Sequence, residues 1–446
     1  MIDNKKTEEH QKYKNFSIDV MSLVGGQLVI AVISLVNSIV LARALGVEGR
    51  GYFIMAMLLP SMLITFSDFG LGQASTKFAA SKKWLASTIF VTNTIVMCIR
   101  LIVIGIVGAI VIHGYSGSLF PGIPKQYLYL GLLQTVGLVI QGMIFPIFLG
   151  LGQGVRYSLI LVASSVLSLL TLSTGWLAVG LSVNLALVLQ FGSSFVMAIY
   201  IYFSVLKHIG EIGTASKQYF KEAFRFGSGI YLSIVSTFAN EKMVLLILNS
   251  FGGVIFVSLY TIAQALTERI YLLSDAVGTM LMPKIAEDPD HNSYMLTPVV
   301  FKLTVIITTI LSSLLMITAD WIITFIYSSE FAGSIEIMRL LLVAVIFSSG
   351  WRVLSQDLNA RGFTKVTAII NVSLAIVSLT LAGILLPLIG LKGAALASIL
   401  AYIFALISGV IFFVKKTSAV SISMLLSFSV IEKSILSKMA RKYFSS

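Results

Sequence analysis

Long apolar stretches, separated by short polar segments, alternate along almost the whole chain. A helix needs about 20 predominantly apolar residues to cross the hydrocarbon core of a bilayer. On this basis the pattern predicts about twelve spanning helices. Their expected limits are 17–43, 52–69, 85–112, 126–149, 158–179, 184–206, 226–249, 254–281, 298–327, 335–358, 366–388 and 393–414.

Composition supports this interpretation, because 57% of the residues are hydrophobic and only 11% are charged. A soluble protein carries about 25% charged residues. Only helices and closed barrels span a bilayer, and barrel strands alternate in short segments, whereas these apolar runs are long and continuous. We therefore predict an all-α polytopic membrane protein.

Basic residues set the expected orientation, since cytoplasmic loops carry an excess of lysine and arginine. With a cytoplasmic N-terminus, only Arg43, Arg50, Lys125 and Lys392, of the 31 lysines and arginines, fall in outer turns. Both termini are then cytoplasmic. The net charge of +12 reflects contact with an anionic inner leaflet, so membrane lipids are expected partners and nucleic acid is not.

This topology divides the chain into five expected parts. The N-terminal segment is not a signal peptide, because no apolar core follows it directly. The last part has apolar and basic residues at roughly helical spacing, which is compatible with an amphipathic helix on the inner membrane surface and also with a disordered tail. The parts are a cytoplasmic tail at 1–16, a six-helix bundle at 17–206, a cytoplasmic linker at 207–225, a second six-helix bundle at 226–414 and a basic cytoplasmic tail at 415–446.

The two halves resemble each other through landmarks that recur at nearly constant offset. Two halves of six spans each enter the membrane in the same direction, so a pseudo-two-fold axis runs along the membrane normal. Such an architecture is typical of a transporter with alternating access. The landmark pairs are Gly46 with Gly252, Asp68 with Asp275, Gly152 with Gly362 and Gly180 with Gly390.

Polar side chains form stripes on several predicted spans. Lipid does not solvate such faces, so we expect them to line a wet cavity, although hydrogen bonding between helices is the alternative for the neutral residues. In span 254–281 the stripe comprises Tyr260, Gln264, Glu268, Tyr271 and Asp275, and in span 335–358 it comprises Ser348, Arg352, Ser355, Gln356 and Asn359.

A few charged residues stand deep in predicted spans, where each costs roughly 2.5 kcal/mol or more. Glu241 and Lys242 are adjacent, so their side chains point about 100° apart on a helix and should face different partners. Other charged residues lie near span ends, where side chains reach the interface. We expect Asp68, Asp320, Asp357, Lys302 and Arg339 to be such anchors.

Four motifs resemble the polysaccharide flippases of the O-antigen and capsule type. They are LARALGVEGRGYF, SDFGLGQASTKFAA, FGGVIFVSLYTIAQAL and LPLIGLKGAALASILAYI. The resemblance implies a monomeric inner-membrane protein of bacteria that moves a polyprenyl pyrophosphate-linked oligosaccharide between leaflets, with a polysaccharide polymerase and chain-length machinery as further partners. Lipid II flippases carry basic residues deep in the first span, whereas Arg43 lies near its outer end here, so lipid II itself is not the expected cargo.

Arginine binds phosphate oxygens in a bidentate manner, and sugars need amide and hydroxyl partners. Together with the resemblance, this chemistry selects three groups of candidates. For the pyrophosphate they are Arg100, Lys242, Arg269 and Arg352. For the sugars they are Gln27, Asn37, Gln134, Gln141, Gln264 and Gln356, and for ion coupling Glu241 and Glu268.

Three other classes of protein remain as alternatives. A multidrug antiporter of the same superfamily should have an acidic cavity with methionine and aromatic walls. A major facilitator carrier should show Asp-Arg-x-Gly-Arg after span 2, a pattern that GLGQASTKFAASKK lacks. An O-antigen polymerase or glycosyltransferase needs a large outer loop, but the longest outer stretch, HGYSGSLFPGIPKQ, has no carboxylate. One cysteine and four scattered histidines suggest neither a metal site nor a cofactor.

Overall fold

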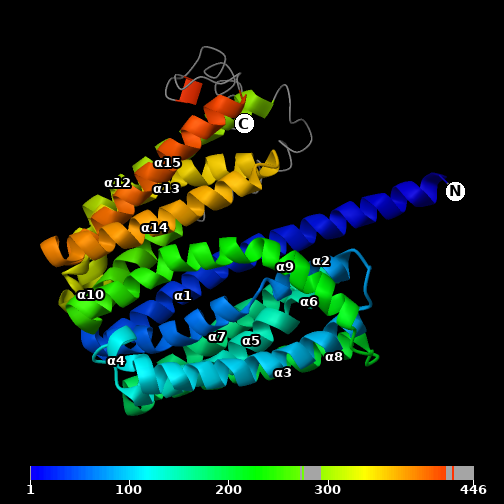
Figure 1. Cartoon of the computed structure of the whole chain (residues 1–446), viewed down its shortest axis with the longest axis horizontal. Coiled ribbons are helices and arrows are strands. Elements are labelled where there is room, and N and C mark those ends of the chain that lie inside the picture. The colour runs from blue at the N-terminus through cyan, green and yellow to red at the C-terminus, as the bar shows by residue number, and fades with distance from the viewer. Residues whose placement is uncertain (1, 272–273, 276–292, 418–423, 426–446) are drawn as a thin grey trace. The chain divides into compact units, whose positions relative to one another are not determined.

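The structure, a computed structural model, describes residues 2–271, 274–275, 293–417 and 424–425 (Figure 1). Every regular element in these residues is a helix, and ten helical segments are long and apolar enough to cross a membrane. The predicted all-α polytopic fold is confirmed. Most of the predicted tail at 415–446 and the end of the predicted span 254–281 lie outside the described residues.

By internal contacts the chain forms two compact units. The first comprises residues 1–258 and 326–330, and the second comprises 259–325 and 331–446. Residues 226–258 therefore pack with the first six predicted spans. The six-plus-six division at 207–225 stays a prediction.

The first unit contains helices α1 to α9 and the beginning of α10. Its core lies where α3, α5, α6 and α8 meet, around Ile89, Met143, Ile147 and Ala198, all fully buried or nearly so. The bounds are α1 Ile2–Ser67, α2 Leu71–Ala80, α3 Ala86–Ile110, α4 Ser116–Leu119, α5 Lys125–Ile144, α6 Pro146–Gly150, α7 Gly154–Val179, α8 Val183–Ile209, α9 Lys217–Phe238 and α10 Val244–Thr267.

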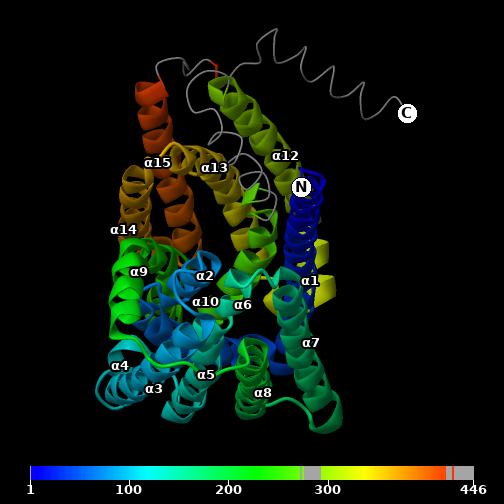
Figure 2. The same ribbon diagram turned by 90° about the vertical axis from the view of Figure 1, so that its right-hand side faces the viewer.

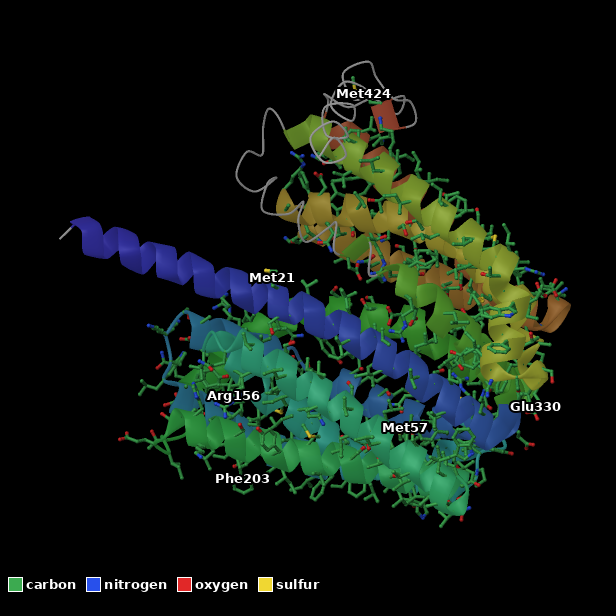
Figure 3. All side chains as sticks on the ribbon, turned by 180° about the vertical axis from the view of Figure 1, so that it is seen from behind. Met21, Met57, Arg156, Phe203, Glu330 and Met424 are labelled. Carbon is green, nitrogen blue, oxygen red and sulfur yellow. The ribbon has the colours of Figure 1, made fainter. Side chains whose placement is uncertain are left out.

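The first unit exposes many large apolar side chains, as expected of helices that face lipid. Phe203 on α8 is 60% exposed, and its side chain points away from the neighbouring helices (Figure 3). Arg156, at the start of α7, instead turns inward, where Nη2 donates to Ser204 Oγ at 3.1 Å.

The second unit continues from α10 into four long helices, α12 Ser293–Trp321, α13 Ser334–Ala360, α14 Thr364–Ile389 and α15 Leu391–Thr417 (Figure 2). Helix α13 packs against both α12 and α15, and α14 packs along α15. Trp351 belongs to the core cluster of this unit and is 3% exposed. Its Nε1 donates to Asn371 Oδ1 of α14 at 3.0 Å.

Residues 424–425 also belong to the second unit. Leu425 is 2% exposed and packs in the cluster around Trp351. Lys302 Nζ donates to the carbonyl oxygen of Met424 at 2.8 Å, and the lysine is 5% exposed. This burial contradicts the expectation that Lys302 anchors at the membrane interface.

Asp357 likewise departs from its expected role as an interface anchor. Its side chain is fully buried and accepts hydrogen bonds from Thr297 Oγ1 at 2.7 Å and from Arg361 Nε at 2.8 Å. The hydrogen bond from Thr297 therefore joins the end of α13 to α12. Asp320 and Arg339 are exposed and pair with each other.

Two helical segments are much longer than a single span. Met21–Ser67 has 47 residues and Lys217–Ile270 has 54, and each corresponds to two predicted spans. Each contains one glycine with a non-helical backbone, Gly46 at φ 68°, ψ −175° and Gly253 at φ 64°, ψ −167°. This region of backbone space is essentially restricted to glycine. The kink therefore separates the two predicted spans in each case.

The matching kinks correct one landmark of the internal repeat. The sequence pairs Gly46 with Gly252, but the residue with the equivalent conformation is Gly253. The corrected offset of 207 residues is the same as that between Asp68 and Asp275. The other glycine landmarks also have positive φ in both halves, 70° and 86° for Gly152 and Gly362, and 74° and 63° for Gly180 and Gly390. Shared backbone conformation thus supports the repeat.

Arg50 follows the first kink and is not a solvent-exposed turn residue. It is 5% exposed, Nη1 donates to the carbonyl oxygen of Ser258 at 2.8 Å, and Nη2 donates to Ser38 Oγ at 3.4 Å. The guanidinium therefore joins α1 to α10 within the first unit.

Candidate substrate-binding sites

A sharp turn at the end of α1 builds one wall of a cavity in the first unit. Asp68 follows the helix directly, and Phe69 and Gly70 then adopt left-handed conformations at φ 46° and φ 67°. The chain reverses there and enters α2 at Leu71. This reversal places Asp68 beside the first residues of α2.

Arg100 of α3 holds this turn with all three guanidinium nitrogens. Nε donates to Ser67 Oγ at 2.9 Å, Nη1 to Asp68 Oδ1 at 3.0 Å, and Nη2 to the carbonyl oxygen of Ile64 at 2.7 Å. The arginine side chain is 5% exposed. Its role as an anion ligand stays a prediction, and in this arrangement binding would require the guanidinium to leave Asp68.

The cavity has a volume of about 440 Å³. This lies in the range of about 300–1,000 Å³ that is typical of small-molecule sites. Residues of α1, α2, α5, α6, α7 and α9 contribute. They are Ile64, Thr65, Asp68, Gly72, Gln73, Thr76, Gly142, Pro146, Leu149, Tyr157 and Ile234.

Close packing of α2 on α5 fixes the shape of this cavity. A Cβ atom on Gly72 would stand 2.5 Å from the carbonyl oxygen of Gly142, so only glycine allows the approach. Thr76 Oγ1 donates to the carbonyl oxygen of Pro146 at 3.0 Å. The Tyr157 ring stacks on Phe145, with the centroids 4.0 Å apart and the planes at 15°. The walls are thus held by packing and by hydrogen bonds.

Several polar groups of the cavity have no hydrogen-bond partner among the described residues. Among them are the Gln73 amide, the Tyr157 hydroxyl and Asp68 Oδ2. Gln73 is exposed, whereas Tyr157 is half-buried. These three groups are available to a ligand. Gln73 and Tyr157 are not among the candidates predicted from the sequence, because each is an isolated polar residue near the end of an apolar run.

In the second unit, the two predicted polar stripes meet at Arg352. Its Nη1 lies 2.7 Å from Asp275 Oδ1, and its guanidinium lies over the Tyr271 ring, 4.2 Å from the centroid. The arginine side chain is 28% exposed and that of Asp275 is 45% exposed. Nε and Nη2 have no partner among the described residues, so Arg352 retains hydrogen-bond donors.

Other members of the stripe on α10 bind each other or a neighbouring helix. Gln264 Nε2 donates to Glu268 Oε1 at 2.7 Å. The Tyr260 hydroxyl lies 3.3 Å from Ser398 Oγ of α15. Arg269 lies in the short 3-10 turn Glu268–Ile270 and is half-buried. Gln356 is half-buried on α13.

The remaining amide candidates belong to the first unit, and three of them lie between helices. Asn37 Nδ2 donates to Ser168 Oγ at 3.3 Å, and Gln141 Nε2 donates to Ser194 Oγ at 3.2 Å. These bonds favour the interhelical alternative for both residues. Gln134 is 4% exposed. Gln27 is exposed on α1. Sugar contact by all four stays a prediction.

Glu241 and Lys242 stand in a π-helical turn, Ala239–Met243, between α9 and α10. Both are half-buried. Such turns insert an extra residue into an α-helix and are frequent at functional sites. The residue pattern predicts a helix here, but the change of winding has no signature in hydrophobic spacing.

A family model and a curated relative each match more than half of the chain. The model of a family described as polysaccharide biosynthesis protein matches residues 18–287, more than half of the chain. The chain is also 24% identical, over 392 residues, to an uncharacterised membrane protein of Methanocaldococcus jannaschii, with 83% of this chain and 91% of that protein covered.

Two solved structures show a similar fold. One is a lipid II flippase, MurJ, in an inward closed conformation, with a TM-score of 0.72, 17% identity, and 95% of this chain and 93% of that chain covered. The other is an inward-facing multidrug resistance MATE family transporter of the MOP superfamily, with a TM-score of 0.68, 20% identity, and 86% and 96% covered. At such identities the likeness concerns the fold alone.

Proposed function

The chain belongs to the polysaccharide biosynthesis protein family, and we propose that it is a flippase for polyprenyl pyrophosphate-linked oligosaccharides. In this proposal it moves repeat units for O-antigen, capsule or exopolysaccharide across the bacterial inner membrane. The bundles at 17–206 and 226–414 move against each other, so that the cargo site opens to one side of the membrane at a time. Both termini are cytoplasmic. The reaction is transport, with no catalytic step, and the protein works as a monomer that delivers cargo to a polymerase and its chain-length machinery.

The environment of Arg352 is the observation that supports this proposal most directly. Its guanidinium contacts Asp275 and Tyr271, but the N–H groups of Nε and Nη2 donate no hydrogen bond to any described residue. A diphosphate offers several anionic oxygens, and a guanidinium can bind two of them at once. An arginine that is partly desolvated, oriented and still has donors is a suitable ligand for such a group.

Arg269 and Lys242 are proposed as further ligands of the pyrophosphate, and Glu241 and Glu268 as ion-coupling groups. All four are half-buried, so none is excluded from a polar ligand by deep burial. Gln264 and Gln356 are proposed as sugar contacts in the second unit.

A multidrug antiporter is the alternative, since one of the similar folds belongs to a multidrug transporter. Such a protein is expected to bind cations in an acidic cavity with methionine and aromatic walls. Asp68 and Asp275 each pair with an arginine instead. At these two positions the pairs leave no net negative charge, which favours a phosphate-bearing or neutral cargo there over a cationic one.

Deletion in the native host tests the proposal. We expect the loss of surface polysaccharide together with accumulation of lipid-linked repeat units on the cytoplasmic side, and recovery of both when the wild-type chain is restored. Unchanged polysaccharide with altered sensitivity to cationic drugs would instead establish the antiporter.

A further inference from the structure

We infer that the cavity of the first unit is a subsite for the neutral sugar part of the cargo, bound through Asp68, Gln73 and Tyr157. The inference rests on the proposed function and assigns a ligand class to a cavity that the pyrophosphate ligands do not line. The cavity volume of about 440 Å³ suits a small polar molecule.

The charge of the cavity wall favours a neutral ligand. Among its eleven lining residues Asp68 is the one that carries a charge. Arg100 Nη1, at 3.0 Å, compensates this carboxylate from behind, but the arginine itself does not line the cavity. A pyrophosphate in this cavity would be repelled by the Asp68 carboxylate, because no lysine or arginine lines the wall. A cationic drug would find that carboxylate already paired, so a neutral ligand fits best.

The available polar groups match the chemistry of hydroxyls. The Gln73 amide and the Tyr157 hydroxyl can each donate and accept, and Asp68 Oδ2 accepts. None of the three has a hydrogen-bond partner in the part of the chain that the structure describes. A sugar hydroxyl is both a donor and an acceptor, so it can satisfy all three kinds of group.

The apolar walls complete the match. Leu149, Pro146 and Ile234 line the cavity beside the Tyr157 ring, and that ring is fixed by stacking on Phe145. Small-molecule sites are lined mainly by apolar and aromatic groups, with a few placed polar groups that fix orientation. Sugar rings present C–H faces as well as hydroxyls, and this surface offers contacts to both.

Purified full-length protein in lipid nanodiscs allows a direct test with two probes. One is undecaprenyl pyrophosphate, which has no sugar, and the other is the lipid-linked oligosaccharide extracted from the native host. We expect the double variant Gln73→Ala/Tyr157→Phe to weaken binding of the oligosaccharide probe about tenfold or more, because two hydrogen bonds are lost. Binding of undecaprenyl pyrophosphate should remain unchanged.

Matched controls are available in the same unit. Gln126 is an exposed glutamine of α5 and Tyr202 a half-buried tyrosine of α8, and neither lines the cavity. Gln126→Ala/Tyr202→Phe should therefore bind both probes like the wild type. Equal weakening of both probes by Gln73→Ala/Tyr157→Phe, or no weakening at all, would overturn the sugar subsite.

The two probes also separate this inference from the proposed function. If the wild type binds neither probe, the flippase proposal itself fails. If the wild type binds both probes, and Arg352→Ala weakens both while Gln73→Ala/Tyr157→Phe weakens neither, the flippase proposal stands and the sugar subsite alone is wrong.

Discussion

Asp68 and Asp275 occupy equivalent positions in the two repeats, and each accepts a hydrogen bond from Nη1 of an arginine, at 3.0 Å and 2.7 Å. The two arginines are not equivalent, because Arg100 belongs to the third predicted span of its half and Arg352 to the fourth. The exposed fractions of the aspartates differ as well, 18% for Asp68 and 45% for Asp275. In the first pair the arginine is buried and fixes the end of α1, while Asp68 lines the cavity. In the second pair both the arginine and the aspartate are partly exposed to a ligand.

Arg352→Ala should abolish transport while the protein still reaches the membrane. Loss of a charge-assisted hydrogen bond costs about 1.5–3 kcal/mol, which weakens pyrophosphate binding roughly tenfold to a hundredfold. Arg352→Lys should restore only part of the function, because an ammonium cannot bind two oxygens in the same plane. Surface polysaccharide and binding of undecaprenyl pyrophosphate are the measurements.

Two controls isolate the guanidinium. Arg339→Ala removes an exposed arginine of the same helix, paired with Asp320, and should leave polysaccharide at the wild-type level. Arg352→Ala/Asp275→Asn removes the carboxylate left behind by the single change. Recovery in this double variant would show that an uncompensated Asp275, and not a lost ligand, caused the defect.

Arg100→Ala should destabilise the protein strongly. The change leaves Asp68 without its ion-pair partner and removes three hydrogen bonds that hold the end of α1. Breaking one side of a buried pair costs about 3–5 kcal/mol. Thermal unfolding of the purified protein should show a clear fall in the midpoint temperature.

The exposed pair of Lys392 and Glu336 supplies the comparison, with side chains 51% and 59% exposed. Exposed pairs contribute about 0–1 kcal/mol, so Lys392→Ala should leave the midpoint almost unchanged. Similar shifts for Arg100→Ala and Lys392→Ala would contradict the structural role of the Arg100–Asp68 pair.

Gly46→Ala and Gly253→Ala should each lower stability by about 1–3 kcal/mol, since alanine is strained at these backbone angles. Gly105 on α3 is the matched control, because a Cβ added there would meet nothing within 4 Å. Gly105→Ala should be neutral or slightly stabilising. If all three variants unfold alike, the kinks do not depend on glycine.

Labelling of single cysteines can establish the topology. Cys98 is exposed and is first replaced by alanine. Ser118 and Thr214 are exposed and lie in the predicted outer turn and the predicted cytoplasmic linker. An impermeant thiol reagent added to intact cells should label Ser118→Cys and spare Thr214→Cys. The opposite pattern would reverse the orientation.

Most of the fold follows from the sequence, because lipid imposes a strict rule on spanning segments. Apolar length alone locates the spans, and glycine marks their ends. Prediction from residue type fails at Gly252 and Gly253. The two residues are identical in type, but only Gly253 adopts the kinked conformation. Backbone dihedral angles decide that question, and residue type does not.

The candidate sites are less predictable for a related reason. The position of Arg100 and Arg352 deep in predicted spans marks both as candidates. It does not show which residue each arginine contacts. Asp68 is 32 positions before Arg100 and Asp275 is 77 positions before Arg352, so tertiary packing alone creates these pairs. Gln73 and Tyr157 come together only through the packing of α2 and α7 around one cavity.

The π-helical turn at Ala239–Met243 has a consequence for comparing related genes. Such a turn contains one residue more than the regular α-helical turn that would connect the same two flanking helices. Removal of a single codon there could therefore convert the turn to regular α winding while Ser236 and Leu248 keep their orientations. An alignment of relatives should allow a one-residue gap at this place, or every position on one side of it will be compared with the wrong neighbour.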